Sequence, residues 1–199
     1  MRPAEIRVAQ MADATLVARI LAEAFAADPV MSWMLGGEGR ALTLFNALSR
    51  RLYLARGFGH IAGEAAATLW LPAGARTAPS VGEEAATALA VLRSGGVGAL
   101  LRGKTVGDIM ARQHPAESHF YLFAVGVLPE MRGRGLGGRI LREGLAMADA
   151  AGASAYLENS NPRNAPLYRS LGFADRAPLP LPAGAPPLVG MLREPRRAA

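Results

Sequence analysis

The residues of this chain best suited to chemistry lie in a glycine- and arginine-rich turn that follows a long apolar stretch. Val125, Gly126 and Val127 end the apolar stretch, and the turn itself consists of Arg132, Gly133, Arg134, Gly135, Leu136, Gly137 and Gly138. A turn of this type at the start of a helix presents several backbone N–H groups at the positive end of the helix dipole, where phosphate binds well. We therefore expect a phosphate-bearing cofactor at this turn.

Two known phosphate-binding motifs are alternative explanations of the turn. A P-loop requires Gly-Lys followed by Ser or Thr, and here the turn ends in Gly-Gly-Arg139. A dinucleotide-binding motif is the closer rival, since the glycines have its spacing and Glu158 follows where a ribose-binding acid would lie. Against it, residues 128–132 separate the strand from the first glycine, and the remaining chain is short for further β-α units. A purely structural glycine turn is the last alternative, and the arginines and the helix start count against it.

The elements that must position this turn alternate between helix and strand. Apolar residues at helical spacing predict helices, and continuous or alternating apolar runs predict strands. The expected strands are 6–8, 58–61, 67–71, 119–128, 153–158 and 188–192. The expected helices are 13–25, 40–55, 81–92, 97–110, 136–148 and 164–170, with a break at Gly95-Gly96. We expect a mixed α/β chain, a single domain over residues 1–199, with a variable helical insert over about 77–115.

Composition narrows the class of protein. Of the 199 residues, 51% are hydrophobic and 19% are charged, which is typical of a folded globular chain. The absence of cysteine excludes disulfides, thiolate catalysis and cysteine-ligated metal, and fits a cytoplasmic protein. The first residues lack the apolar core of a signal peptide, and no uninterrupted apolar run approaches the roughly 18 residues of a membrane span. We therefore expect neither secretion nor a membrane partner.

The net charge is positive and comes almost entirely from arginine. It amounts to +6, and Lys104 is the only lysine, so Schiff-base chemistry has one candidate. Most basic residues are scattered and aromatic residues do not alternate with them, so we expect no nucleic-acid partner. His60 and His114 form no spaced ligand set with carboxylates, so we expect no metal site.

Two separate blocks of the chain carry a resemblance to a known family. Val127-x-Pro129 followed by Arg132-x-x-Gly135-x-Gly137 resembles the acetyl-CoA motif of the GNAT superfamily of N-acetyltransferases. The later block 157–173, with its asparagines, a tyrosine and a final Gly-Phe, is similar to a second block of that superfamily. The resemblance extends over most of the chain, and its pattern is nearest to the puromycin N-acetyltransferase-like branch.

The resemblance implies both a fold and a reaction. The fold would be the GNAT acyl-CoA N-acyltransferase fold, an α/β (α+β) arrangement with a mixed, mostly antiparallel sheet and helices on both faces. Acetyl-CoA would donate an acetyl group directly to a primary amine of a small molecule, without a metal. The backbone of residues 133–138 would hold coenzyme A, with Arg132, Arg134 or Arg139 facing the pyrophosphate. The backbone of Val125, Gly126 and Val127 would pair with the pantetheine arm and polarise the thioester.

Three side chains of the later block are the candidates for the chemistry. Tyr168 is expected to be the general acid, since a phenol with a pKa near 10 carries a proton at neutral pH, and its alternative role is to anchor a short helix. Asn164, one helical turn earlier, would contact the cofactor or cap that helix. Glu158 would accept the proton of the amine, bind a substrate ammonium, or serve as a structural hydrogen-bond acceptor. Asp28 is a weaker candidate, since ending a helix explains it adequately.

Several alternatives stay open at this stage. The chain could be a non-catalytic acyl-CoA-binding or regulatory module, a protein or peptide N-acetyltransferase or, more remotely, a nicotinamide-dependent oxidoreductase. A homodimer is compatible with the sequence. Four aromatic residues could line an acceptor pocket: Trp33, Phe45, Tyr53 and Trp70. At their spacing, burial in the core is the stronger expectation.

Overall fold

The computed structural model, which describes residues 5–76 and 78–196, has one mixed sheet at its centre. Its strands are β1 (Ile6–Val8), β2 (His60–Ala62), β3 (Ala66–Leu71), β4 (His119–Val127), β5 (Ser154–Asn159), β6 (Ala174–Pro178) and β7 (Val189–Arg193). They lie in the order β1-β2-β3-β4-β5-β7-β6, and every neighbouring pair is antiparallel except β4 and β5, which are parallel. The expected mixed, mostly antiparallel sheet is confirmed.

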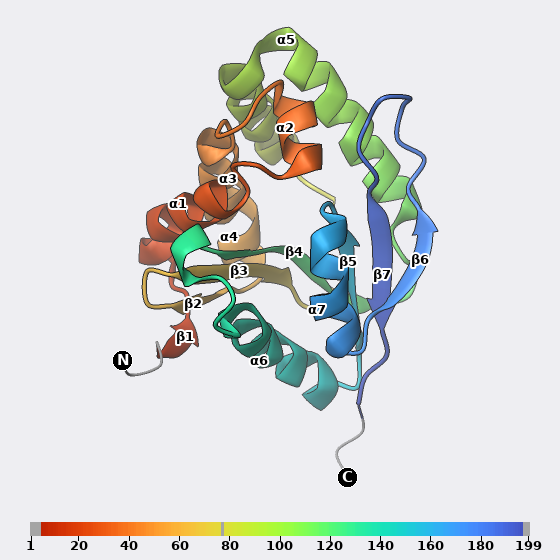
Figure 1. Cartoon of the computed structure of the whole chain (residues 1–199). Helices are drawn as coiled ribbons and strands as arrows, with labels where there is room; N and C mark the ends of the chain where they lie inside the picture. Colours follow the sequence, from red (N-terminus) through yellow and green to blue (C-terminus); the bar gives the residue numbers. More distant parts are fainter. Residues whose placement is uncertain (1–4, 77, 197–199) are drawn as a thin grey trace.

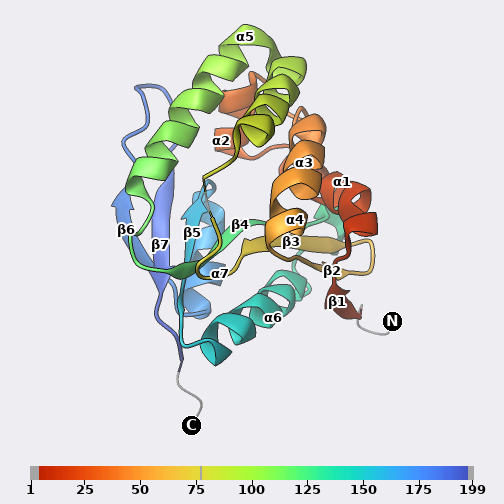
Figure 2. The same cartoon turned by 180° about the vertical axis from the view of Figure 1, so that it is seen from behind.

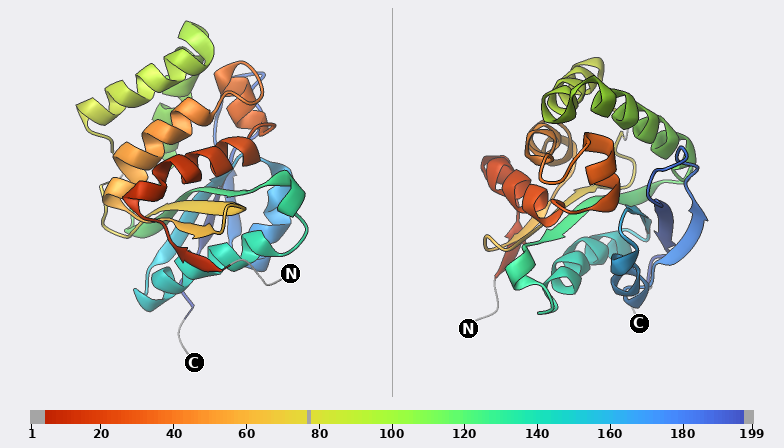
Figure 3. Two further views of the ribbon diagram at one scale, coloured as in Figure 1. Left: turned by 90° about the vertical axis from the view of Figure 1, so that its left-hand side faces the viewer. Right: turned by 45° about the horizontal axis from the view of Figure 1, so that its top comes forward.

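Helices cover both faces of this sheet. They are η1 (Met11–Asp13) with α1 (Ala14–Ala24), α2 (Pro29–Leu35), α3 (Leu42–Leu48) with the π-helical η2 (Ser49–Tyr53) and α4 (Leu54–Arg56), α5 (Val81–Gln113), η3 (Pro129–Met131), α6 (Leu136–Ala150), and η4 (Pro162–Asn164) with α7 (Ala165–Ser170). Helices α1, α3 and α5 lie on one side of the sheet, and α6 lies on the other (Figures 1 and 2). The two views of Figure 3 show the same layers from the side and from above.

Helix α5 occupies the insert expected between the third and fourth strands, although Thr77, where that insert was expected to begin, lies outside the described residues. Ser80 caps the helix by accepting a hydrogen bond from the backbone N–H of Glu83. The expected break is confirmed, since Gly96 has φ 71° and ψ −166° in the middle of the helix. A Cβ on the preceding Gly95 would lie 2.2 Å from the carbonyl oxygen of Leu35, so this glycine allows α5 to pack on α2.

Length and apolar composition alone would allow α5 to cross a membrane, and 17% of its most apolar window is buried inside the protein. Its buried side chains face α2 and α3, and they are Ala90, Val91, Ala99, Val106 and Ile109.

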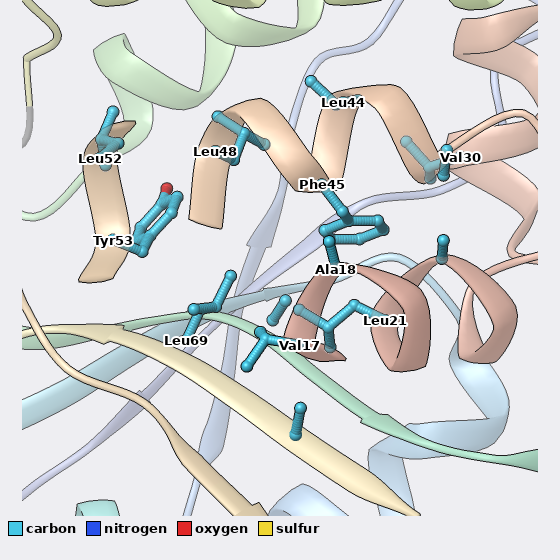
Figure 4. Packing of buried hydrophobic residues seen from close by; sticks show 14 of the residues in the cluster. Val17, Ala18, Leu21, Val30, Leu44, Phe45, Leu48, Leu52, Tyr53 and Leu69 are labelled. Carbon is cyan, nitrogen blue, oxygen red and sulfur yellow. The ribbon is translucent and has the colours of Figure 1, made fainter. Parts of the chain in front are cut away.

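Apolar side chains fill both sides of the sheet. On the α1 and α3 side, Phe45 packs on Ala18 and Leu21 of α1, and Val17 of α1 lies beside Leu69 of β3 (Figure 4). On the α6 side, Trp70 is fully buried, and a Cβ on Gly144 would lie 2.5 Å from the Trp70 ring, so only glycine lets α6 approach β3 this closely. Burying a side chain of this size stabilises the fold by about 1.5–3 kcal/mol, so the two layers hold the central strands between them.

The central strands β4 and β5 separate halfway along their length. Their pairing runs from His119 opposite Ser154 to Leu122 opposite Leu157 and ends there. The register of β3 and β4 shifts at the same level, which leaves Phe123 as an extra residue in β4. The second half of β4 therefore has a neighbouring strand on the β3 side and an open edge on the β5 side.

Candidate active site

The glycine-rich turn lies at the N-terminus of α6, a helix of 15 residues. Gly133 and Gly135 have φ angles of 74° and 71°, and a Cβ added to either would meet nothing within 4 Å. The first backbone hydrogen bond of the helix runs from the N–H of Arg139 to the carbonyl of Gly135, at 3.1 Å. The N–H groups of residues 136–138 therefore have no acceptor within the helix. Open space, glycines and unpaired N–H groups together form a backbone cradle for an anion.

The open edge of β4 lies beside this cradle. The N–H of Leu128 donates to the carbonyl of Ala65 at 2.9 Å, which fixes the phase of the antiparallel pairing. Because hydrogen-bonded residues alternate along such a pair, the N–H and C=O groups of Val125 and Val127 point away from β3. They point to the side from which β5 has separated. Gly126 between them packs on α1, where an added Cβ would lie 2.7 Å from Cβ of Ala24.

Arg132 joins the turn to two other elements. Its Nε donates to the carbonyl of Val127 at 3.2 Å, and a terminal nitrogen donates to the carbonyl of Ala24 at 2.8 Å. Ala24 is the last residue of α1, so the guanidinium satisfies a carbonyl at a helix end. This placement gives Arg132 a role in positioning the cradle.

Tyr168 lies on α7 and is 7% exposed, with its ring against that of Phe173. Burial raises the pKa of its phenol well above the usual value, and the nearby negative charge of Asp28 raises it further. Within residues 5–76 and 78–196 the Tyr168 hydroxyl has no hydrogen-bond partner. The Tyr168 hydroxyl therefore keeps its proton and donates it in a hydrogen bond to no other described residue.

Asp28 performs two tasks at once. Its carboxylate caps α2 by accepting from the backbone N–H of Met31 at 2.9 Å, and it accepts from the hydroxyl of Ser160 at 2.6 Å. The expectation that Asp28 ends a helix is wrong, since α1 already ends at Ala24 and Asp28 begins α2. The same contacts hold α2 against the segment that follows β5.

Glu158 lies on the other face of the sheet, with its side chain 3% exposed. Its Oε2 accepts a hydrogen bond from the hydroxyl of Tyr121 at 2.8 Å. Its Oε1 is buried and has no hydrogen-bond partner among the described residues. The nearest ring nitrogen, Nδ1 of His114, is 3.6 Å away. A buried carboxylate with one unused oxygen is poised to accept a proton or a donor group.

Three tyrosines surround this carboxylate. Burial is the main cause that raises the pKa of Tyr53, Tyr121 and Tyr156, and the charge of Glu158 adds to it. All three phenols therefore stay protonated at neutral pH and present donors and ring faces to the carboxylate. A cavity of about 110 Å³ lies beside Tyr156 and is also lined by Gln113 and Arg176.

Two histidines continue the polar cluster away from Glu158. Nδ1 of His119 lies 2.7 Å from the carbonyl oxygen of Glu117, and its Nε2 lies 3.0 Å from Nε2 of His114. Burial lowers the pKa of His119 below its usual value, which favours a neutral ring. We use the name Glu158 cluster for Glu158, Tyr53, Tyr121, Tyr156, His114 and His119.

The structure therefore separates the residues predicted from the sequence into two groups. Residues 125–127 and 132–138 gather at the start of α6, and Asn164 is exposed at the start of α7. Asn164 occupies the N-cap position of α7, as the capping alternative expected, although its side chain makes no capping hydrogen bond there. The cap of the preceding turn comes from Asn161, which accepts from the N–H of Arg163. Glu158 lies in the second group.

Most members of the Glu158 cluster were not predicted as functional residues. Of the four aromatic candidates, Tyr53 reaches the cluster, Phe45 and Trp70 lie in the core, and Trp33 lies under the guanidinium of Arg102. No group of three His, Asp or Glu side chains within the described ranges is placed to hold a metal ion.

Comparisons with known proteins agree with this geometry. The sequence model of the acetyltransferase (GNAT) family matches residues 67–173. A solved structure from Corynebacterium glutamicum, described as histone acetyltransferase HPA2 and related acetyltransferase, is similar with 25% identity and a TM-score of 0.72, and the match covers 100% of this chain and 99% of the other.

Two further solved structures share the fold. The polyamine N-acetyltransferase of Drosophila melanogaster is 16% identical with a TM-score of 0.57, over 96% of this chain and 100% of the other. The ribosomal-protein-S18-alanine N-acetyltransferase of Escherichia coli is 17% identical with a TM-score of 0.54, over 98% and 96%.

Proposed function

The chain belongs to the GNAT family of N-acetyltransferases, which use acetyl-CoA as donor, and from that premise we propose that it acetylates a primary amine of a small molecule. The observation that carries this proposal is a pair of side chains on opposite faces of the sheet, with Tyr168 in the apolar cluster on the α6 face and Glu158 beside Tyr121 on the other face. Tyr168 holds a proton without a partner, and Glu158 has a carboxylate oxygen without a partner. Acyl transfer to an amine needs one group of each kind.

The donor side of the site fits acetyl-CoA. The cradle at residues 133–138 suits a pyrophosphate, since its glycines leave open space beside unpaired backbone N–H groups. The outward N–H groups of Val125 and Val127 suit an extended arm that takes the place of a neighbouring strand. When bound, acetyl-CoA supplies a thioester that an amine can attack and a thiolate that leaves.

Tyr168 and Glu158 then divide the proton transfers between them. The Tyr168 hydroxyl keeps its proton until a strong base forms beside it, because burial and Asp28 disfavour the phenolate. It is the general acid for a leaving thiolate. Glu158 accepts the proton that the attacking amine must lose, at its unpartnered oxygen. The tyrosines of the Glu158 cluster surround a cationic amine with ring faces and oxygen atoms.

A small acceptor is supported by what covers this side of the sheet. Leu179 and Leu188, from the segment that joins β6 to β7, are buried in the same core as Ile109 of α5. Figure 1 shows this segment rising beside α5. Two parts of the chain thus enclose the acceptor side, which suits a compact amine better than a polypeptide.

The test is coenzyme A release with a panel of amines, comparing the wild-type protein with Tyr168→Phe. We expect small amines to be acetylated, and we expect Tyr168→Phe to lower kcat about 100-fold, in the range typical of general acid catalysis. Its affinity for acetyl-CoA, measured by calorimetry, should not change. Acetylation of peptides alone would contradict the small-molecule proposal, and an equal loss of affinity and kcat would contradict the general-acid role.

A further inference from the structure

We infer that Arg176 binds a carboxylate group of the acceptor, so that the amine acetylated by this protein also carries a negative charge. This carboxylate site rests on the proposed function, because the same acceptor must bring its amine to Glu158. Arg176 belongs to β6, an exposed strand at the edge of the sheet that takes no part in the proton transfers.

Glu158 and Arg176 lie in one row across the last three strands of the sheet. Glu158 of β5 lies opposite Gly190 of β7. The register of β6 and β7 shifts just beyond Asp175, which leaves Arg176 beside Gly190 in a β-bulge. Because neighbouring strands lie about 4.8 Å apart, the backbones of Glu158 and Arg176 are separated by about 10 Å. The row thus places an acid and a guanidinium on either side of one glycine.

The two charged side chains share one face of the sheet. Asp175 pairs with Arg169 of α7 on the face that α6 covers, and Arg176 lines a cavity with Tyr156 on the opposite face. Burial and then the charge of Glu158 raise the pKa of the Tyr156 phenol, and the charge of Arg176 acts on it in the opposite direction. The phenol of Tyr156 therefore lies within the influence of both charges.

The cavity beside Tyr156 has room for a carboxylate group. Its volume of about 110 Å³ is several times the roughly 10–15 Å³ that one water molecule requires. It lies over Gly190, where an added Cβ would be 2.8 Å from the Tyr156 hydroxyl oxygen, so this glycine lets the ring extend across β7. Tyr156 belongs both to the cavity and to the Glu158 cluster, so an acceptor that spans the two passes its hydroxyl.

The guanidinium of Arg176 is available to a ligand. Within residues 5–76 and 78–196 it forms neither a hydrogen bond nor an ion pair. Two other arginines near this edge are occupied, since Arg169 pairs with Asp175 and Arg193 pairs with Asp149. A guanidinium presents parallel N–H donors that match the two oxygens of a carboxylate. Gln113, at the end of α5, adds a side-chain amide to the same cavity.

This pair of charges distinguishes two kinds of small amine. An amino acid places its ammonium group at Glu158 and its carboxylate at Arg176, so both charges of the site are matched. A diamine of the same length places a second positive charge beside Arg176, where like charges repel. The net charge of +6 acts in the same direction, because it attracts anionic molecules to the protein.

The test uses acceptors that differ in charge and not in length. The series runs from glycine through β-alanine and γ-aminobutyrate to ε-aminocaproate, each paired with its uncharged amide, and putrescine is the diamine. We expect the wild-type protein to prefer the acid of at least one length over its amide by about 30-fold in kcat/KM, as a charge-assisted hydrogen bond would provide. Arg176→Gln should abolish this preference by raising KM for the acid, with kcat and the KM of the amide unchanged.

Two further variants separate recognition from a general effect of charge. Arg169→Gln removes the same charge from the other side of β6 and should keep the wild-type preference. Arg176→Glu should reverse the preference, so that putrescine becomes a better acceptor than γ-aminobutyrate. Because Arg176 is exposed, its variants should unfold at the wild-type temperature.

The outcomes distinguish this carboxylate site from the proposed function. An acid preference that survives in Arg176→Gln, or that Arg169→Gln loses equally, overturns the role of Arg176. If the wild-type protein acetylates only amines that lack a carboxylate, the carboxylate site fails and the proposed function stands. If it acetylates no amine at all, both fail.

Discussion

The two faces of the β4–β5 pair differ in chemistry although the same strands supply both. Phe120, Leu122 and Leu157 point to the face under α6, where they join an apolar cluster with Trp70. The residues next to them in sequence point to the other face, where they meet His114 and Tyr53: these are His119, Tyr121, Tyr156 and Glu158. Successive residues of a strand face opposite sides of a sheet.

This difference shows how one short stretch of chain can both stabilise the fold and perform chemistry. The α6 face is closed by apolar packing, so it can hold the strands rigidly. The opposite face carries ionisable groups at a cost in desolvation, which the packed face offsets. Substitutions at neighbouring residues should therefore have different effects: one should lower activity and the other should lower stability.

The largest effect is expected from the neighbours Glu158 and Leu157. Glu158→Gln should lower kcat about 1,000-fold by removing the proton acceptor, with a change in unfolding free energy below about 1 kcal/mol, because the amide oxygen can still accept from Tyr121. Leu157→Ala should lower the unfolding free energy by about 3 kcal/mol through the cavity it leaves, with kcat nearly unchanged. Urea unfolding and coenzyme A release measure the two quantities, and equal effects of both variants would break the comparison.

The next effect concerns the cradle at the start of α6. Gly135→Glu places a side chain and a negative charge where φ is 71° and the space is open, and we expect the Kd of acetyl-CoA to rise about 100-fold. Gly152→Glu is the matched control, because Gly152 has φ 61° and equally open space just after the other end of α6. Calorimetry should find normal affinity for the control, and a similar loss in both variants would mean that backbone strain, not the anion site, is responsible.

A smaller effect is expected from the arginine that ties the cradle to the opposite face. Arg132→Ala removes the hydrogen bonds to the carbonyls of Val127 and Ala24, and we expect the Kd of acetyl-CoA to rise about 10-fold, since such bonds are each worth about 1 kcal/mol. Arg19→Ala, which breaks an exposed ion pair with Glu64, should leave the Kd unchanged. A loss above 100-fold would point to direct contact with the cofactor.

The smallest effect concerns the unfolding free energy at acid pH, which depends on an ion pair away from the candidate active site. The guanidinium of Arg193 holds the pKa of Asp149 below its usual value and ties α6 to β7. Because the carboxylate is favoured in the folded state, this contribution is complete above the ordinary Asp pKa of about 3.9 and is lost as pH falls below it.

Between pH 5 and pH 3 the wild-type protein should therefore lose about 1 kcal/mol of unfolding free energy that Asp149→Asn does not lose. Asp108→Asn should show nearly the same acid loss as the wild type, because its pair with Lys104 is exposed and screened by water. If Asp149→Asn lost as much stability on acidification as the wild type, the ion pair would have no such role.

The donor side could be predicted from the sequence because its signals are local. The positive φ angles of Gly133 and Gly135 and the start of α6 each depend on a few adjacent residues. The break of α5 at Gly95-Gly96 could be predicted for the same reason. The Glu158 cluster depends instead on the end of α5, a turn of η2 and two strands that meet only in the folded chain. One signal was present, since His119 and Tyr121 alternate with apolar residues in a strand expected to be buried on both faces.

Helix α5, which covers the proposed acceptor side, is attached to the sheet so that its length can vary independently of the strands. Helix α5 joins β3 to β4, and these strands are antiparallel neighbours whose residues Leu71 and Tyr121 lie opposite each other. The connection thus departs from and returns to one end of the sheet, so its length can change without altering any strand register. A different insert between residues 72 and 113 would therefore change what packs beside the Glu158 cluster while the strands keep their pairing.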